Sequence, residues 1–146
     1  MAIAQRSAQS IWKGDLAHGT GTLNGSSGAL NELQVTWASR TERSGGKTSP
    51  EELVAAAHAS CFSMALANEL AQAGHAPEQL DVSARVTLDS KDDAPTVTTS
   101  ELTVSGRVPG IDQEEFTKAA TAAGKNCPIS RALGGLDISV QATLAQ

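Results

Sequence analysis

Two cysteines, Cys61 and Cys127, are the residues of this chain best suited to chemistry. A cysteine sulfur is a nucleophile or a metal ligand only as a thiolate, so its surroundings decide its use. Cys127 directly precedes Pro128 and a predicted helical turn, and a helix N-terminus lowers the pKa of a thiol. Cys61 lies within an apolar stretch, where burial raises the pKa. The local sequence therefore favours Cys127 as the more acidic thiol, although each cysteine could also be a small buried hydrophobic residue.

His58 is the third residue that could take part in chemistry, because it lies three residues before Cys61 on one face of a predicted helix. Together with Cys127, these two side chains could supply three zinc ligands. The chain lacks the paired C-x-x-C spacing that makes a zinc motif specific. A packed or hydrogen-bonded core histidine is the better interpretation of His58. A non-enzymatic dimer that binds a small ligand or a metal through Cys61, His58 and Cys127 stays open as the alternative to an enzyme.

The helix that must position Cys61 is predicted from the stretch SPEELVAAAHASCFSMALANEL. Ser49 is suited to the N-cap, Pro50 to the first helical position and Glu52 to the reciprocal position of a capping box. Gly74 is expected to end the helix. The stretch is apolar on nearly all faces, which predicts burial all round. A single small domain can hardly surround such a helix, so we expect a second copy of the chain to cover it.

The remaining segments predict an α+β fold with one domain spanning residues 1–146. A glycine-rich stretch at 18–28 is interpreted as turns of an antiparallel meander, because no strand-loop-helix unit surrounds it as in a phosphate loop. Period-two alternation and turn residues predict the strands, and amphipathic spacing with Asp112 as N-cap predicts the second helix. The predicted strands are 7–14, 33–39, 80–89, 96–108 and 136–144, and the predicted later helices are 112–125 and 127–133.

Composition excludes several classes of partner. The net charge of −5 and the pI near 5.1, without a basic stripe, argue against nucleic acid and against a polybasic membrane patch. The longest uncharged run, 53–68, is short for a membrane span, and the first residues lack the apolar region of a signal peptide. We therefore expect a cytoplasmic protein, in which two cysteines serve as thiols or as a working redox pair rather than as a permanent disulfide.

Two long motifs bring a protein family into view. SPEELVAAAHASCFSMALANELAQAG, followed by NCPISRAL, resembles the OsmC branch of the OsmC/Ohr family of thiol-dependent peroxidases. The resemblance extends to IWKGDLAHGTGTL, WASR and VPGID, and so covers nearly the whole chain. It implies an OsmC-like fold, with antiparallel sheets wrapped around a long buried central helix. It also implies an intertwined homodimer with two sites at its interface, and no cofactor.

The resemblance assigns roles to four residues of this chain. Cys61 matches the cysteine that attacks a hydroperoxide, and Cys127 matches the one that resolves the sulfenic acid through an intrachain disulfide. Arg40 and Glu51 match an arginine and a glutamate that complete the site. Such an arginine would offset desolvation of the Cys61 thiolate, and the carboxylate would hold the guanidinium in place. The substrates implied are organic hydroperoxides and hydrogen peroxide, with an external dithiol of the lipoyl type as reductant in oxidative stress defence.

Helix geometry adds a constraint on the site. Glu51 and Cys61 lie ten residues apart on one predicted helix, a separation of about 15 Å. If both serve one site, we expect Glu51 to arrive from the second subunit on an antiparallel helix. Arg43 competes with Arg40 for the cationic role, and Thr41 stands where the family pattern has an aromatic residue.

The substrate preference and one further alternative also follow from the residues. Apolar walls from Leu53, Phe62, Met64 and neighbouring strands would favour organic hydroperoxides over hydrogen peroxide. A structural disulfide between Cys61 and Cys127 is the third interpretation, and it predicts a bond that resists mild dithiols.

Overall fold

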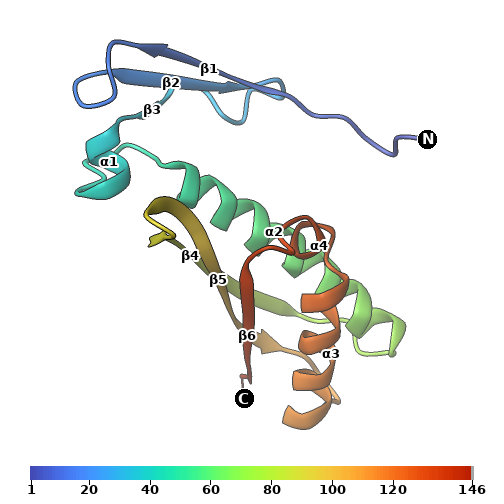
Figure 1. Cartoon of the computed structure of the whole chain (residues 1–146). Helices are drawn as coiled ribbons and strands as arrows, with labels where there is room; N and C mark the ends of the chain where they lie inside the picture. Colours follow the sequence, from blue (N-terminus) through green and yellow to red (C-terminus); the bar gives the residue numbers. More distant parts are fainter. Residues whose placement is uncertain (146) are drawn as a thin grey trace. The chain divides into compact units, whose positions relative to one another are not determined.

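The computed structural model describes residues 1–145, which form two compact units that meet in sequence between Leu53 and Val54 (Figure 1). The first unit contains a three-stranded antiparallel sheet in the order β1-β2-β3, followed by a short helix. The second contains a three-stranded sheet in the order β4-β5-β6 and two helices. The long helix α2 begins in the first unit and continues into the second.

The first unit is built from β1 (Ala8–Lys13), β2 (Thr20–Gly25), β3 (Leu33–Val35) and α1 (Trp37–Thr41). The interpretation of residues 18–28 as turns was wrong over β2. Gly21 pairs with Trp12 across the sheet and lies against its ring, so that a Cβ at Gly21 would stand 2.9 Å from the Trp12 Cε3 atom. The glycine here makes room for an aromatic side chain on the neighbouring strand rather than allowing a turn.

The strand predicted over 33–39 ends earlier than expected, at Val35. Thr36 caps α1, because its Oγ1 accepts a hydrogen bond from the Ser39 N–H at 3.0 Å. The Ser39 Oγ in turn accepts one from the Thr36 N–H at 2.9 Å. This reciprocal cap satisfies two N–H groups at the start of α1 and favours a helix over the alternative strand.

The limits of α2 (Pro50–Gln72) agree with the prediction to within one residue. The Ser49 Oγ accepts a hydrogen bond from the Glu52 N–H at 3.1 Å, which confirms the N-cap. The expected return bond from Glu52 is replaced by one with the Thr48 hydroxyl at 2.7 Å. Gly74 ends the helix with a φ of +86°. That conformation is easily reached only by glycine and is typical of a helix C-terminus.

The second unit contains β4 (Gln79–Lys91), β5 (Ala94–Arg107), α3 (Gln113–Asn126), α4 (Pro128–Ala132) and β6 (Asp137–Leu144). β4 and β5 form an antiparallel hairpin, whose turn places Asp92 and Asp93 at φ values of +54° and +60°. β6 pairs with β5 in parallel, so the prediction of wholly antiparallel sheets was wrong for this pair. The chain returns through α3 and α4 before β6 begins, and a crossover of this kind permits parallel pairing.

The core of the second unit contains the sheet, α3 and one stripe of α2. Four residues spaced four apart on α2 are buried, and they are His58, Phe62, Leu66 and Leu70. The three apolar residues of the stripe belong to the same core as Leu102 and Val104 of β5 and Phe116 of α3. His58 is the buried polar member of the stripe. Burial of α2 all round is not achieved by one chain, since Met64 is 68% exposed.

The length of α2 also bears on the membrane question. It is the one helix in residues 1–145 that is long and apolar enough to cross a membrane by length and composition. The uncharged run 53–68 considered in the sequence analysis therefore underestimated the length of this apolar helix. The core of a soluble protein accounts for such a helix equally well, because a buried stripe along its length packs against a sheet.

A substitution pair tests the packing of α3 on β6. A Cβ at Gly124 would stand 2.7 Å from the Val140 Cγ2 atom, whereas one at Gly135 would meet nothing within 4 Å. We expect Gly124→Ala to lower the free energy of unfolding by about 1–3 kcal/mol through overpacking. Gly135→Ala serves as the matched control and should change it little. Denaturant unfolding of the reduced protein measures both, and equal effects at the two positions would contradict the packing described.

Candidate active site

The two cysteines lie together in the core of the second unit, where both are free thiols. Cys61 comes from the middle of α2, immediately before the buried Phe62. Cys127 is the N-cap residue of α4, as its position before Pro128 indicated. Cys127 is fully buried, whereas Cys61 is half-buried. A small reagent from solvent can therefore meet the Cys61 sulfur more readily than the Cys127 sulfur.

The start of α4 determines the acidity of Cys127. Burial alone would raise the pKa of this thiol, but hydrogen bonds outweigh burial and hold the pKa below its ordinary value. The donors are the Ser130 N–H, the Cys61 thiol, the Ser130 hydroxyl and the Ile129 N–H. These groups favour the charged form of the sulfur. The sequence-based prediction of an acidic Cys127 is confirmed.

Cys61 is shifted in the opposite direction. Burial raises the pKa of the Cys61 thiol, and the Ile129 N–H only partly opposes it. The neighbouring Cys127 raises the pKa of Cys61 further, through its hydrogen bond and its charge. The more accessible thiol is thus the less acidic one within this chain. A nearby positive group would lower the pKa of Cys61 and favour its thiolate.

His58 is a fully buried histidine with both ring nitrogens engaged. Its Nδ1 lies 2.6 Å from the Ser100 Oγ, and its Nε2 lies 2.7 Å from the Ser130 Oγ. Burial lowers the pKa of His58, which keeps the imidazole neutral. The prediction of a hydrogen-bonded core histidine is confirmed.

This arrangement bears on the metal-binding alternative. An imidazole whose two nitrogens bond to hydroxyls has none left for a metal ion. Within residues 1–145, no group of three His, Cys, Asp or Glu side chains is placed to hold a metal. The geometry does not support the set of Cys61, His58 and Cys127 as metal ligands.

Ser100 and Ser130 are neighbours of the site that sequence reasoning missed. Ser100 occupies an inward position on β5, on the same face as the buried Leu102 and Val104. A serine in register with two core hydrophobics was the signal that could have found it. Ser130 follows Cys127 by three residues and is 5% exposed. Its role could be anticipated only by knowing that His58 packs beside it.

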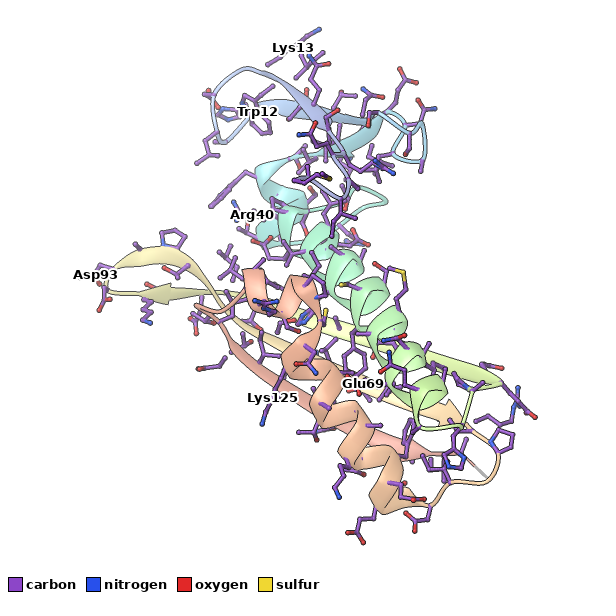
Figure 2. The ribbon with its side chains drawn as sticks, turned by 90° about the vertical axis from the view of Figure 1, so that its right-hand side faces the viewer. Trp12, Lys13, Arg40, Glu69, Asp93 and Lys125 are labelled. Carbon is purple, nitrogen blue, oxygen red and sulfur yellow. The ribbon has the colours of Figure 1, made fainter. Side chains whose placement is uncertain are left out.

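Arg40 and Glu51 form a second pair, in the first unit. The Arg40 Nη2 donates to the Glu51 Oε1 at 2.7 Å, and the Arg40 Nε lies 3.1 Å from both carboxylate oxygens. Figure 2 labels Arg40 on α1, close to the start of α2. The guanidinium also lies 5.9 Å from the Trp37 ring centroid, within the range of a cation–π contact. Because only part of each side chain is exposed, 28% and 11%, the ion pair is shielded from water.

The pair clarifies two expectations about the cation. Arg43 lies exposed in the loop after α1, so the geometry favours Arg40 as the ordered guanidinium. Arg40 and Glu51 pair within one chain, so the expectation that Glu51 serves Cys61 from the second subunit stays a prediction and now includes Arg40. If either residue acts on a second copy of the chain, both therefore act there together.

An apolar hollow of about 340 Å³ in the first unit borders Arg40. Its lining is dominated by aromatic and aliphatic side chains: Trp12, Leu16, Leu23, Val35, Trp37, Pro50 and Leu53. Of the three residues expected to form apolar walls, Leu53 lines this hollow. Phe62 lies instead in the core of the second unit, and Met64 is exposed. Arg40 is the charged residue of the lining, and Ser10 and Thr36 are its other polar members.

Comparison with known proteins places this geometry in context. A family profile described as OsmC-like protein matches residues 43–141. Proteins named peroxiredoxin OsmC from Escherichia coli (strain K12) and Shigella flexneri are each 41% identical to this chain over 128 residues, covering 88% of it and 89% of each relative. The crystal structure of the organic hydroperoxide resistance protein OhrB of Bacillus subtilis has a TM-score of 0.75 at 23% identity, covering 94% of this chain and 98% of that one. At this identity the likeness to OhrB concerns the fold.

The coupling between the two thiols yields a prediction about acidity. Cys127 raises the pKa of Cys61, so Cys127→Ala should lower it. The ultraviolet absorbance of the thiolate, followed against pH, measures the change. Ionisation of tyrosine cannot interfere, since the chain has none. A pKa of Cys61 that stays constant or rises in Cys127→Ala would contradict the described arrangement.

Proposed function

The chain belongs to the OsmC-like protein family, and we propose that it is a thiol-dependent peroxidase that reduces organic hydroperoxides. The relatives that are 41% identical to it are named peroxiredoxins. The observation that carries the residue assignment is the unequal exposure of the two thiols. The half-buried Cys61 can meet a peroxide, while the fully buried Cys127 can meet only Cys61. We therefore assign Cys61 as the attacking thiol and Cys127 as the resolving thiol.

The first step oxidises Cys61. Its thiolate attacks the distal oxygen of the hydroperoxide, the O–O bond breaks, and the alkoxide leaves and takes up a proton to become an alcohol. The sulfur loses two electrons and becomes a sulfenic acid. Hydrogen peroxide would react in the same way and release water.

The second step joins the two sulfurs. The Cys127 thiolate attacks the Cys61 sulfenic sulfur, the S–O bond breaks, and the departing hydroxide takes up a proton to become water. The low pKa of Cys127 supports this role, because a larger thiolate fraction is available to attack. Placement of both sulfurs in one core makes the step intramolecular and limits further oxidation of Cys61. An external dithiol of the lipoyl type then reduces the disulfide by thiol exchange, which returns both thiols.

Ionisation of Cys61 requires a cation, and we infer that a second copy of the chain supplies it. Glu51 and Cys61 are ten residues apart along α2, or about 15 Å, so a pair anchored at Glu51 is poorly placed for Cys61 of the same helix. In a homodimer with antiparallel α2 helices, the Arg40–Glu51 pair of each subunit would serve Cys61 of the other. Exposed apolar residues on α2, such as Met64, support a partner helix at this face.

The same arrangement suggests the substrate class. An alkyl group would occupy the apolar hollow, and its peroxide would lie toward Arg40 in the wall. The guanidinium would then stabilise both the Cys61 thiolate and the charge on the departing oxygen. We place this activity in the cytoplasm, where reducing conditions keep the two cysteines available as thiols.

Titration with peroxide tests the assignment of the two cysteines. Reduced protein treated with cumene hydroperoxide should lose both thiols, and the intact mass should fall by two hydrogens. Cys127→Ser should instead gain oxygen as a sulfenic or sulfinic acid, and Cys61→Ser should not react. Hydrogen peroxide in parallel samples should react more slowly, because it gains nothing from an apolar hollow.

Three other results of this titration would contradict the assignment of the two cysteines or the peroxidase function. If Cys127→Ser fails to react while Cys61→Ser becomes oxidised, the roles are reversed and the more acidic thiol attacks first. A disulfide that a mild dithiol fails to reduce would favour a structural bond. Inert thiols combined with metal bound by the purified protein would favour the non-enzymatic alternative.

A further inference from the structure

A chain of hydrogen bonds runs through the core behind Cys127 and connects three elements. It begins at Ser100 on β5, passes through both ring nitrogens of His58 on α2, and reaches Ser130 on α4. The two heavy-atom distances are 2.6 Å and 2.7 Å, and His58 and Ser100 are completely buried. Ser130 lies in the first turn of α4, three residues after Cys127, and its hydroxyl is among the groups that hold the pKa of Cys127 below its ordinary value.

We propose that His58 is a positioning residue for the resolving step, because it fixes Ser130 in the first turn of α4, from where the Ser130 hydroxyl would donate to the Cys127 sulfur. This inference rests on the proposed peroxidase function and concerns the second half of the cycle. The hydroxyl stabilises the attacking thiolate and fixes the direction from which the sulfur approaches Cys61.

The direction of each hydrogen bond follows from the chemistry of a neutral imidazole, which has one donor and one acceptor. For Ser130 to donate its proton to Cys127, the Ser130 oxygen must accept one from His58 Nε2–H. His58 Nδ1 is then the acceptor, and the Ser100 hydroxyl donates to it. Among the described residues, every buried side-chain nitrogen and oxygen has a hydrogen-bond partner. With this arrangement of protons, each hydrogen bond of the series has one donor and one acceptor.

The position of these polar groups argues against a purely structural role. His58 occupies a stripe whose other buried members are Phe62, Leu66 and Leu70. Buried polar groups are costly unless they are paired, and hydrophobic side chains could fill the same space without that requirement. Here the paired groups end at Ser130, in the first turn of the helix that begins at Cys127, which is where a stabilising donor has a chemical use.

Few titratable groups other than Cys127 itself face the region around Ser130. From α2, Cys61 and His58 are the titratable residues that face this region. Lys125 near the end of α3 and Arg131 on α4 are exposed. The residues that β5 and β6 contribute to this core are hydrophobic apart from Ser100: Leu102, Val104, Ile138 and Val140.

The resolving step balances with this arrangement. Cys127 has given its thiol proton to solvent before it attacks, and the Ser130 hydroxyl stabilises the resulting charge without transferring its own proton. As the S–S bond forms, the departing hydroxide takes one proton from solvent and becomes water. The Cys127 sulfur then carries no charge, and the hydrogen bond from Ser130 loses most of its strength.

The first test measures the pKa of Cys127 in a Cys61→Ser background, where it is the sole thiol. Ser130→Ala should raise this pKa. At a fixed pH below the pKa, the thiolate fraction of Cys127 should fall about tenfold. His58→Gln should raise it as well, by a smaller amount. Ser63→Ala is the matched control, because the Ser63 hydroxyl lies on the same helix and donates to the Ala59 carbonyl. It should leave the pKa of Cys127 unchanged.

The second test follows one turnover in protein that retains both cysteines. Rapid quenching and intact mass should show Cys61 sulfenic acid forming no more slowly in Ser130→Ala than in the wild-type protein. Conversion to the disulfide should be slower by about tenfold. Ser130→Thr, which keeps a hydroxyl, should restore much of the rate. Thermal unfolding identifies any variant that fails to fold. In that case Ser100→Ala tests the other end of the hydrogen-bond series and should slow disulfide formation by a smaller factor.

The results separate this inference from the peroxidase assignment. A pKa and a disulfide rate in Ser130→Ala equal to those of Ser63→Ala would overturn the positioning role, even if the wild-type protein consumes peroxide. Absence of both the sulfenic acid and the disulfide in peroxide-treated wild-type protein would overturn the peroxidase proposal. The shift in the pKa of Cys127 in the Cys61→Ser background would still be measurable.

Discussion

Burial of the Cys61 sulfur is the constraint on which the other features of the site depend. The position on α2 that brings this thiol beside Cys127 also removes part of it from water, which raises its pKa. A sulfur in that environment needs a nearby cation before it can attack a peroxide. The chain has an ordered guanidinium in Arg40, which pairs with Glu51, and Glu51 precedes Cys61 by ten residues along α2. In the proposed homodimer, a second copy of the chain would supply this cation and would also cover the exposed apolar residues of α2.

The two thiols divide the work because their surroundings differ. Cys61 is accessible but weakly acidic, while Cys127 is buried and acidic through the first turn of α4 and the Ser130 hydroxyl. A cation from outside the chain can lower the pKa of an accessible, weakly acidic thiol when the substrate site is assembled. In the proposed mechanism, the buried acidic thiol of Cys127 reacts with the oxidised Cys61. The hydrogen bonds of His58 keep this second sulfur ready without exposing it.

Local features of the chain could be predicted from sequence, and long-range contacts could not. Ser49 and Gly74 mark the limits of α2 because capping chemistry acts within a few residues. The acidity of Cys127 was predictable because Pro128 follows it directly. By contrast, Ser100 and Ser130 lie 42 and 72 residues from His58, and nothing local indicates that they meet it. The strand at Gly21 and the parallel pairing of β6 were missed for the same reason, since each depends on a partner strand.

The most direct test of the account is the activity of a mixed dimer, purified with distinct tags, that combines a Cys61→Ser subunit with an Arg40→Met subunit. If each site takes its thiol from one chain and its guanidinium from the other, this dimer contains one intact site and one that lacks both groups. We predict about half the peroxidase activity of the wild-type dimer for that reason, while each parent homodimer is nearly inactive. If each site were built within one chain, both sites of the mixed dimer would be damaged. An activity no higher than that of the parent homodimers would therefore contradict the account.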